Sequence, residues 1–172
     1  KVANKKMKKL SGGMKRRAGI AQAMLNNPKI LILDEPTAGL DPNERIRFRN
    51  LISELSEDRL VLLSTHIVSD IEYIANEILL MKDGKLMHKG TADEIINSMT
   101  ETVWECFVEK NMVSDFMKKY KISNMKSEAD GVILRIISHE KPFVNAQSVE
   151  ASLEDVFLYY FGEKAGDENA AI

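Results

Sequence analysis

Two short apolar runs, each ending in polar residues, constrain the fold more than any other feature. Residues 30–33 and 60–63 are apolar at four consecutive positions, which is typical of parallel strands covered on both faces. The first run stops at Asp34-Glu35 and the second at Ser64-Thr65-His66, and a helical pattern follows each. Strand, polar end and helix thus occur twice, which predicts βαβ units in an α/β fold with a mainly parallel sheet. Both polar clusters would lie in the crevice at the carboxyl ends of the strands.

Helices are predicted on either side of the first run. Apolar residues recur at helical spacing after Gly12-Gly13, so a helix is expected to start just after the two glycines and to end at residues 26–28. A second helix starts after Asp41, which can act as the N-cap. Pro42 then takes the first helical position and Glu44 completes a capping box.

The remaining patterns predict a second, smaller domain. Asp83-Gly84 between two apolar segments is a strong hairpin signal, and Thr91 with Glu94 caps the next helix. After about residue 99 the alternation of strand and helix gives way to a different order of elements. Strands are expected near 103–108, 122–125 and 132–137, and helices near 112–120 and after Ser152. We therefore expect a first domain over 1–98, a small α+β accessory domain over 99–162 and a flexible tail over 163–172.

Composition restricts the class of protein. The net charge is −2, 44% of the residues are hydrophobic and 29% are charged, which is typical of a soluble globular chain. Cys106 is the single cysteine, so no intramolecular disulfide can form, and we expect it to be a core thiol in a reducing compartment. No apolar run approaches the roughly 18–20 residues that cross a bilayer.

The amino end of the first predicted helix is a candidate anion site. Ser11 can act as the N-cap, and Gly12 and Gly13 carry no side chain, so a phosphate could approach the backbone N–H groups closely. A turn followed by an N-cap explains the same three residues without any ligand. The motif alone therefore leaves both readings open.

The polar strand ends suggest hydrolytic chemistry. Adjacent side chains in extended chain point to opposite sides, so Asp34 could hold a hydrated Mg²⁺ while Glu35 activates an attacking water. His66 would lie at the same rim, where a ring N–H could bind a phosphate oxygen. Acidic residues that merely mark a strand end, and a structural histidine, are the alternatives.

The order of these motifs resembles the second half of an ATP-binding-cassette (ABC) ATPase, which implies a partial P-loop NTPase core. Residues 10–13 (Leu10, Ser11, Gly12 and Gly13) resemble the signature motif, residues 30–34 the Walker B strand and Leu40-Asp41 the D-loop. The resemblance implies that Asp34 serves Mg²⁺, that Glu35 is the catalytic carboxylate and that His66 is the switch histidine.

The resemblance also implies a partner cassette. Two cassettes would dimerise head to tail around two ATP molecules, with Ser11 and Gly13 reaching the γ-phosphate held by the partner and Asp41 at the dimer interface. Met14 stands where the family more often has glutamine, and its side chain lacks the amide group that would make a polar contact there.

One family motif is absent from the sequence. The 172 residues contain no Gly-x-x-x-x-Gly-Lys-[Ser/Thr], the loop whose N–H groups and lysine hold the phosphates. The resemblance therefore implies the C-terminal part of a larger cassette, which by itself neither binds nor hydrolyses ATP.

The last predicted helix refines the class. Residues 152–158, Ser-Leu-Glu-Asp-Val-Phe-Leu, resemble the ending of cassettes from bacterial antibiotic, bacteriocin and multidrug exporters. The leading expectation is the ATPase subunit of such an exporter, bound to a transmembrane permease subunit at the inner face of the cell membrane, with no nucleic acid partner. A soluble, non-transport ABC ATPase and a non-catalytic assembly module are the alternatives.

Overall fold

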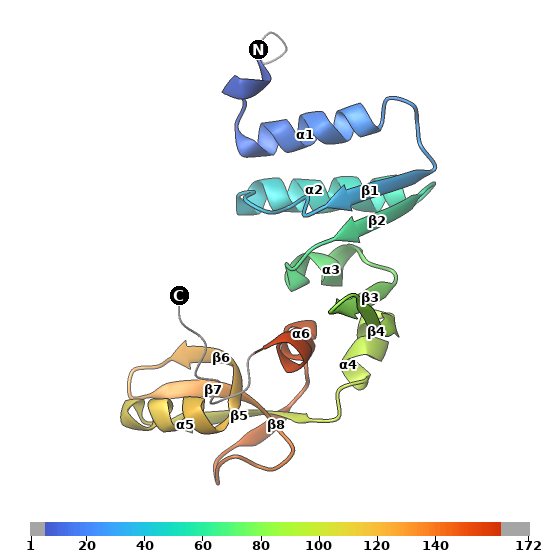
Figure 1. The fold of residues 1–172 in the computed structure, drawn as a ribbon. Helices are drawn as coiled ribbons and strands as arrows, with labels where there is room; N and C mark the ends of the chain where they lie inside the picture. The colour runs from blue at the N-terminus through green and yellow to red at the C-terminus, as the bar shows by residue number, and fades with distance from the viewer. Residues whose placement is uncertain (1–5, 163–172) are drawn as a thin grey trace. The chain divides into compact units, whose positions relative to one another are not determined.

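The computed structural model describes residues 6–162, and its contacts divide the chain into two compact units (Figure 1). The first unit is Lys1–Ile74 and the second is Ala75–Ile172. The tail predicted over 163–172 lies outside the described residues. The domain boundary predicted after residue 98 stays a prediction.

The first unit alternates helices and strands, as the sequence predicts. Strands β1 and β2 pair in parallel, in a register that joins Ile30 to Leu60 at one end and Asp34 to Ser64 at the other. Helix α2 makes the crossover between them, which a parallel pair requires. The elements of this unit are η1 (Met7–Lys9), α1 (Gly12–Ala23), β1 (Ile30–Asp34), α2 (Pro42–Ser56), β2 (Leu60–Ser64) and α3 (Val68–Ile74).

Helices α1 and α2 cover one face of this strand pair. The buried core residues are Ile20 of α1, Leu31 and Leu33 of β1, and Phe48 and Ile52 of α2. The alternate residues of the strands are exposed, including Ile32 at 70% and Leu60 at 63%. The expectation that both faces are covered is therefore wrong for the described residues, because the strand alternates buried and exposed positions.

The helix starts differ from the predictions in two details. Helix α1 begins at Gly12, so the two glycines form its first turn instead of preceding it, and Ser11 is the N-cap. Asp41 caps α2 by accepting a hydrogen bond from the Glu44 N–H at 2.9 Å, with Pro42 in the first turn, as predicted. The Glu44 carboxylate, expected to complete a capping box, instead forms ion pairs with Arg17 and Arg47.

The second unit begins with the predicted hairpin. Strands β3 (Ile78–Lys82) and β4 (Lys85–Gly90) pair antiparallel around Asp83 (φ 51°) and Gly84 (φ 72°), which is the left-handed geometry of a tight hairpin turn. Helix α4 (Ala92–Asn97) follows, and Thr91 and Glu94 form the predicted capping box.

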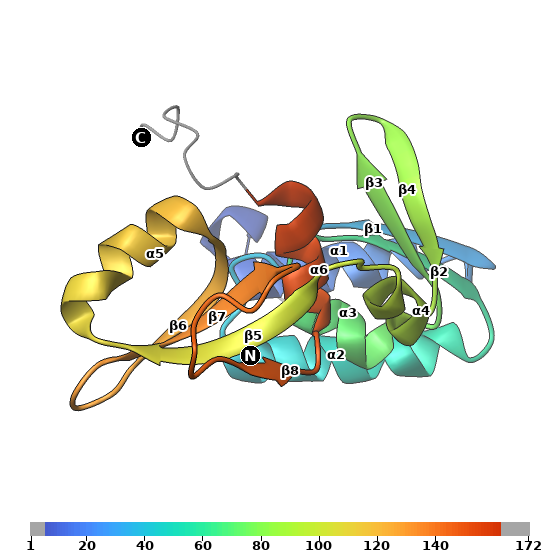
Figure 2. The same cartoon turned by 90° about the horizontal axis from the view of Figure 1, so that it is seen from below.

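A four-stranded antiparallel sheet forms the rest of the second unit (Figure 2). Its strand order is β6-β7-β5-β8, and β8 was not predicted. Within residues 6–162, β1 and β2 are the only parallel pair, so the expected mainly parallel sheet holds for those two strands alone. The elements are β5 (Thr102–Val108), η2 (Lys110–Met112), α5 (Val113–Lys119), β6 (Lys121–Ser127), β7 (Val132–Ser138), β8 (Gln147–Val149) and α6 (Leu153–Phe161).

The sheet of the second unit packs against a helix on each face. Phe116 of α5 packs on Leu134 and Ile136 of β7, in a core that includes the predicted thiol Cys106. Burial raises the pKa of that thiol. Arg135 lies between these two strand residues and therefore points to the opposite face, where it contacts Asp155 of α6.

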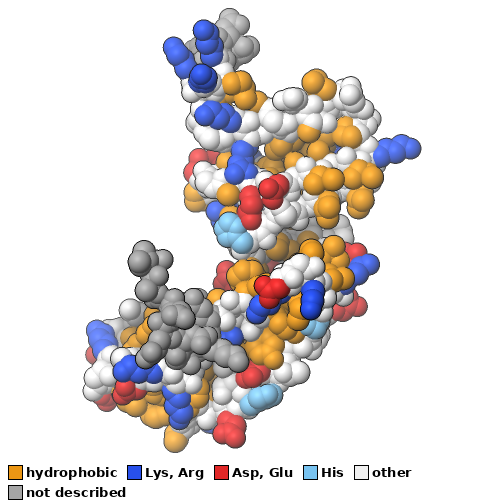
Figure 3. Space-filling view, viewed as in Figure 1, with side chains coloured by type: hydrophobic (Ala, Val, Ile, Leu, Met, Phe, Trp, Pro, Cys, Tyr) orange, Lys and Arg blue, Asp and Glu red, His pale blue; other side chains and the backbone are white. Residues whose placement is uncertain are grey.

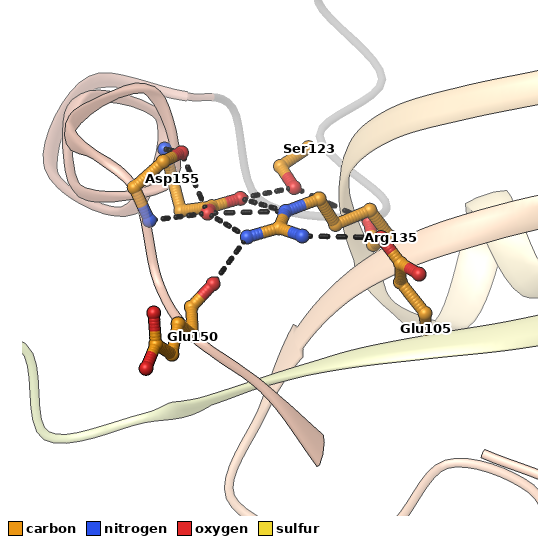
Figure 4. A network of polar contacts seen from close by, with 6 residues as sticks. Glu105, Ser123, Arg135, Glu150 and Asp155 are labelled. Carbon is orange, nitrogen blue, oxygen red and sulfur yellow. Dashed lines mark hydrogen bonds and ion pairs between the residues drawn. The ribbon is translucent and has the colours of Figure 1, made fainter. Parts of the chain in front are cut away.

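Asp155 is buried, and its carboxylate accepts hydrogen bonds from three residues (Figure 4). Its carboxylate accepts hydrogen bonds from the Arg135 guanidinium at 2.8–3.1 Å, from Ser123 Oγ at 2.6 Å and from the Ser152 N–H and Oγ at 2.8 Å. Burial alone would raise the pKa of Asp155, but these bonds outweigh it and hold the pKa below its usual value. Arg135 also bonds to Glu105 Oε1 and to the Glu150 carbonyl oxygen.

None of the helices among residues 6–162 combines the length and the apolar character needed to cross a membrane.

Candidate functional site

The parallel register brings the two polar strand ends together. Asp34 ends β1 and lies opposite Ser64, which ends β2. Ser64 Oγ donates a hydrogen bond of 2.5 Å to Asp34 Oδ1. Asp34 is exposed, so its carboxylate oxygens can also be reached by a water-bound cation.

Glu35 lies just beyond the strand and leaves the extended conformation. Its φ is +43°, in the left-handed region that costs a non-glycine residue about 1–3 kcal/mol. The interpretation that Asp34 and Glu35 continue an extended strand and point to opposite sides is therefore wrong at Glu35. The Glu35 N–H still donates to the Ser64 carbonyl oxygen at 2.9 Å, which ties the turn to β2.

The Glu35 carboxylate is held by the segment that follows β2. Glu35 Oε1 accepts from the His66 N–H at 3.1 Å and lies 2.7 Å from His66 Nδ1, while Oε2 accepts from Thr65 Oγ1 at 3.3 Å. The side chains remain accessible, at 35% exposure for Glu35 and 69% for His66. Figure 3 shows acidic side chains and a histidine gathered on one face of the first unit, beside exposed hydrophobic side chains.

The predicted signature and D-loop residues line one hollow in the first unit. Ser11, Gly12 and Gly13 contribute from the start of α1, and Leu40 and Asp41 from the segment before α2. A Cβ atom placed on Gly13 would lie 3.2 Å from Leu40 Cδ2, so the glycine permits this close approach.

Charge at this hollow comes from both helices. The Arg17 guanidinium of α1 pairs with the Glu44 carboxylate of α2. The first turn of α1 contains no acidic residue, and Ser11 Oγ accepts from the Met14 N–H at 3.3 Å. Leu10, the remaining predicted signature residue, ends η1 just before this turn and is partly buried.

Three contacts that the sequence analysis missed support the site. Arg16 of α1 donates a hydrogen bond to the Glu35 carbonyl oxygen, and Thr65 binds the Glu35 carboxylate. Asp70 of α3 is fully buried, with its oxygens 3.9 Å from Arg45 and Arg49 of α2, which is close enough for charge attraction but too far for a hydrogen bond. Arg16 lies one turn after Gly12-Gly13, and this helical spacing is the signal that could have suggested it.

The described residues contain no group of three or more His, Cys, Asp or Glu side chains that could hold a metal ion. Asp34 is a single exposed carboxylate, and carboxylate oxygens are a ligand type that a hydrated Mg²⁺ accepts, because this ion dehydrates reluctantly and prefers oxygen ligands.

The sequence is similar to those of known proteins over part or most of its length. Residues 1–38 match the family model described as ABC transporter. The chain is 38% identical over 111 residues to the uncharacterized ABC transporter ATP-binding protein YxlF of Bacillus subtilis, covering 64% of this chain and 38% of that protein. It is 34% identical over 171 residues to the bacitracin transport ATP-binding protein BcrA of Bacillus licheniformis, covering 90% and 56%.

A third relative is the Nod factor export ATP-binding protein I of Burkholderia thailandensis, with 39% identity over 97 residues, 56% of this chain and 32% of that protein. The chain thus spans about a third to just over half of the length of these three relatives. By these matches it is related to the ATP-binding proteins of ABC transporters, which confirms the resemblance predicted from the motifs.

Proposed function

We propose that the chain is part of the ATP-hydrolysing subunit of an ABC transporter that exports antibiotic-, peptide- or drug-like substrates. The observation that carries the proposal is the Glu35–His66 pair at the carboxyl ends of β1 and β2, beside Asp34. The relatives named for bacitracin transport and for Nod factor export support the class of substrate. A P-loop NTPase core in the whole protein belongs to the same proposal.

Glu35 is the proposed general base. Its partly exposed carboxylate would accept a proton from the attacking water while the bond from the γ-phosphorus to the bridging oxygen breaks. The Glu35 contacts to Thr65 and His66 would keep the carboxylate aimed at that water. Because His66 Nδ1 faces Glu35, Nε2 is the ring nitrogen proposed to bind a phosphate oxygen, and the two contacts together require a proton on both ring nitrogens.

Asp34 is the proposed contact for Mg²⁺. Its exposed carboxylate and the neighbouring Ser64 hydroxyl are oxygen donors, which suit a hydrated Mg²⁺. The ion would offset negative charge on the phosphates. Asp34 would orient it through direct or water-mediated contact.

The start of α1 is the proposed contact for a partner's nucleotide. Leu10, Ser11, Gly12 and Gly13 would face the γ-phosphate held by a second ABC ATPase domain in a head-to-tail dimer. The lack of an acidic residue in the first turn of α1 supports this role, because helix N-termini favour anions. Asp41 lines the same hollow and would lie at the dimer interface.

Nucleotide binding requires more than these residues supply. The 172 residues contain no Gly-x-x-x-x-Gly-Lys loop, so the donors that offset the charge of ATP are not all present. We propose that this chain alone has negligible ATP affinity and no Mg-ATP hydrolysis. Calorimetry that showed micromolar ATP binding to the purified 172-residue chain would contradict this part of the proposal.

The proposed location follows from the transporter assignment. The complete subunit would bind a transmembrane permease subunit and lie peripherally on the cytoplasmic face of the cell membrane. Co-purification with a multi-span membrane protein would distinguish this proposal from a soluble ABC ATPase and from an assembly module.

The complete protein provides the test of the catalytic assignment. Glu35→Gln keeps the size and hydrogen-bonding capacity of the side chain but removes the base, so steady-state hydrolysis should fall about 10²–10⁴-fold with ATP binding retained. Glu54→Gln, at an exposed position of α2, is the matched control and should leave turnover unchanged. Near-normal turnover in Glu35→Gln would reject the assignment.

A further inference from the structure

Arg16 binds the backbone of Glu35, not a carboxylate. Its guanidinium donates to the Glu35 carbonyl oxygen, and the same oxygen accepts from the Ala38 N–H at 3.3 Å. The Arg16 side chain is partly buried, whereas Lys15 before it is exposed. Arg17, the next residue, pairs with Glu44, so the two adjacent arginines of α1 serve different segments.

Glu35 needs such support because of its backbone conformation. At φ +43° a residue with a side chain persists only where its surroundings hold it in place. On one side, the Glu35 N–H donates to the Ser64 carbonyl oxygen at 2.9 Å. On the other side, Arg16 and Ala38 hold the Glu35 carbonyl oxygen, so the residue is fixed at both of its peptide groups.

The backbone direction decides where the carboxylate points. With Glu35 in the left-handed conformation, Oε1 reaches the His66 N–H at 3.1 Å and His66 Nδ1 at 2.7 Å. Relaxation of Glu35 to the ordinary extended region would turn its side chain away from this position. The contact that holds the carbonyl oxygen therefore helps to aim the carboxylate.

We infer that Arg16 is a positioning residue for Glu35. It holds the Glu35 carbonyl oxygen, keeps the carboxylate against His66 and ties the helix that begins at Gly12-Gly13 to the strand that ends at Asp34. The inference rests on the proposed ATP hydrolysis for its catalytic meaning. The structural link between Arg16 and the Glu35–His66 pair can be tested without that activity.

The first experiment measures steady-state kinetics of the complete protein with three variants. Arg16→Ala should lower kcat about 10–100-fold, because misplacement of a catalytic group by about 1 Å can cost this much, with KM for ATP within about twofold. Arg16→Lys retains an N–H donor and should recover most of the loss. Lys15→Ala removes the same charge from an exposed neighbour and should behave as wild type. An unchanged kcat in Arg16→Ala, or a loss confined to KM, would overturn the inference.

The second experiment measures amide hydrogen exchange in the 172-residue chain. Arg16→Ala should speed exchange of the His66 amide about tenfold or more, because this N–H is protected by the Glu35 carboxylate, while Phe48 inside α2 stays unchanged. Equal acceleration at both amides would show general destabilisation and would contradict the inference. If the complete protein hydrolysed no ATP, the proposed function would fail while the exchange result still decided the Arg16 link.

Discussion

Glu35 and Asp155 are two carboxylates that each accept several hydrogen bonds, yet their surroundings differ. Glu35 lies in the first unit at 35% side-chain exposure, with a left-handed backbone and contacts from Thr65 and His66. Asp155 lies in the second unit at 1% exposure, in the first turn of a regular helix, facing Arg135. A buried and fully bonded carboxylate stabilises a fold, whereas a strained and accessible one is suited to act on a ligand.

The starts of α1 and α6 show the same contrast. Ser11 and Ser152 both cap their helices with a hydrogen bond of 3.3 Å from the third residue beyond. At α6, Asp155 returns bonds to Ser152 and supplies negative charge to the first turn. At α1, Gly12, Gly13 and Met14 occupy the corresponding positions, so the first turn carries no acidic residue. The N–H groups at the amino end of α6 thus find partners within the chain. The amino end of α1 is instead suited to receive an anion.

The largest expected effect is at the start of α1. Gly13→Asp in the complete protein should abolish ATP-dependent dimerisation, because its side chain would fill the hollow beside Leu40 and place a negative charge where a phosphate is proposed to bind. Light scattering with and without Mg-ATP measures the dimer. Gly19→Asp on the same helix, where a Cβ atom meets nothing within 4 Å, is the control. An ATP-dependent dimer in Gly13→Asp would count against the contact with a partner.

The next effect concerns the stability of the second unit. Asp155→Ala leaves the Arg135 guanidinium without its main partner and should lower the free energy of unfolding by about 3–5 kcal/mol. Trp104 is the single tryptophan and lies in β5, so urea unfolding of the 172-residue chain followed by its fluorescence reports on this unit. Glu154→Ala, at the exposed position before Asp155, should change the free energy by less than about 0.5 kcal/mol. Equal losses in the two variants would refute the assigned role of the network.

A matched pair of serine substitutions compares the two helix starts. Ser152→Ala should destabilise the second unit by about 1–2 kcal/mol, because it removes both the cap and a donor to Asp155. Ser11→Ala removes an exposed cap alone and should cost the first unit about 0.5–1 kcal/mol. Amide exchange resolves the two units separately. A larger cost at Ser11 would reverse the comparison.

The smallest expected effect is a decrease, at acid pH, in the contribution of Asp155 to the free energy of unfolding. The pKa of Asp155 is lowered by folding, so its contribution to stability is present above its unfolded pKa of about 3.9 and is lost as pH falls through the lower folded value. The difference in unfolding free energy between wild type and Asp155→Asn should be constant from about pH 7 to pH 5 and shrink below about pH 4. Urea titrations at each pH measure this difference. A difference that grew at acid pH would contradict the predicted direction of the Asp155 pKa shift.

The sequence predicted features that depend on local chemistry. The Asp83-Gly84 turn, the Thr91–Glu94 capping box and the N-caps at Ser11 and Asp41 each involve residues within a few positions of one another. The alignment of β1 with β2 also followed from the sequence pattern. Two parallel strands that each end in polar residues must place those residues at the same edge of the sheet. The neighbourhood of Asp34, Glu35 and His66 could therefore be predicted.

Contacts between distant side chains could not be predicted. Arg16 and Glu35 are 19 residues apart and Arg135 and Asp155 are 20 apart, and no periodicity links them. Glu44 is the clearest example, because its carboxylate could complete a capping box or form an ion pair. Only the folded chain brings Arg17 close enough to favour the ion pair. The left-handed conformation of Glu35 was likewise hidden, since it arises from contacts made on both sides of the residue.

We propose that Glu35 serves chemistry, whereas Asp155 serves structure. The most direct test measures ATP turnover of the complete protein for Glu35→Gln and Asp155→Asn, together with the unfolding free energy of the same two variants in the 172-residue chain. Glu35→Gln should lower turnover about 10²–10⁴-fold and change stability by less than about 1 kcal/mol. Asp155→Asn should lower stability by at least about 2 kcal/mol and leave turnover per folded molecule near wild type. Loss of both properties in both variants, or the reverse pattern, would show that these roles are not divided between Glu35 and Asp155.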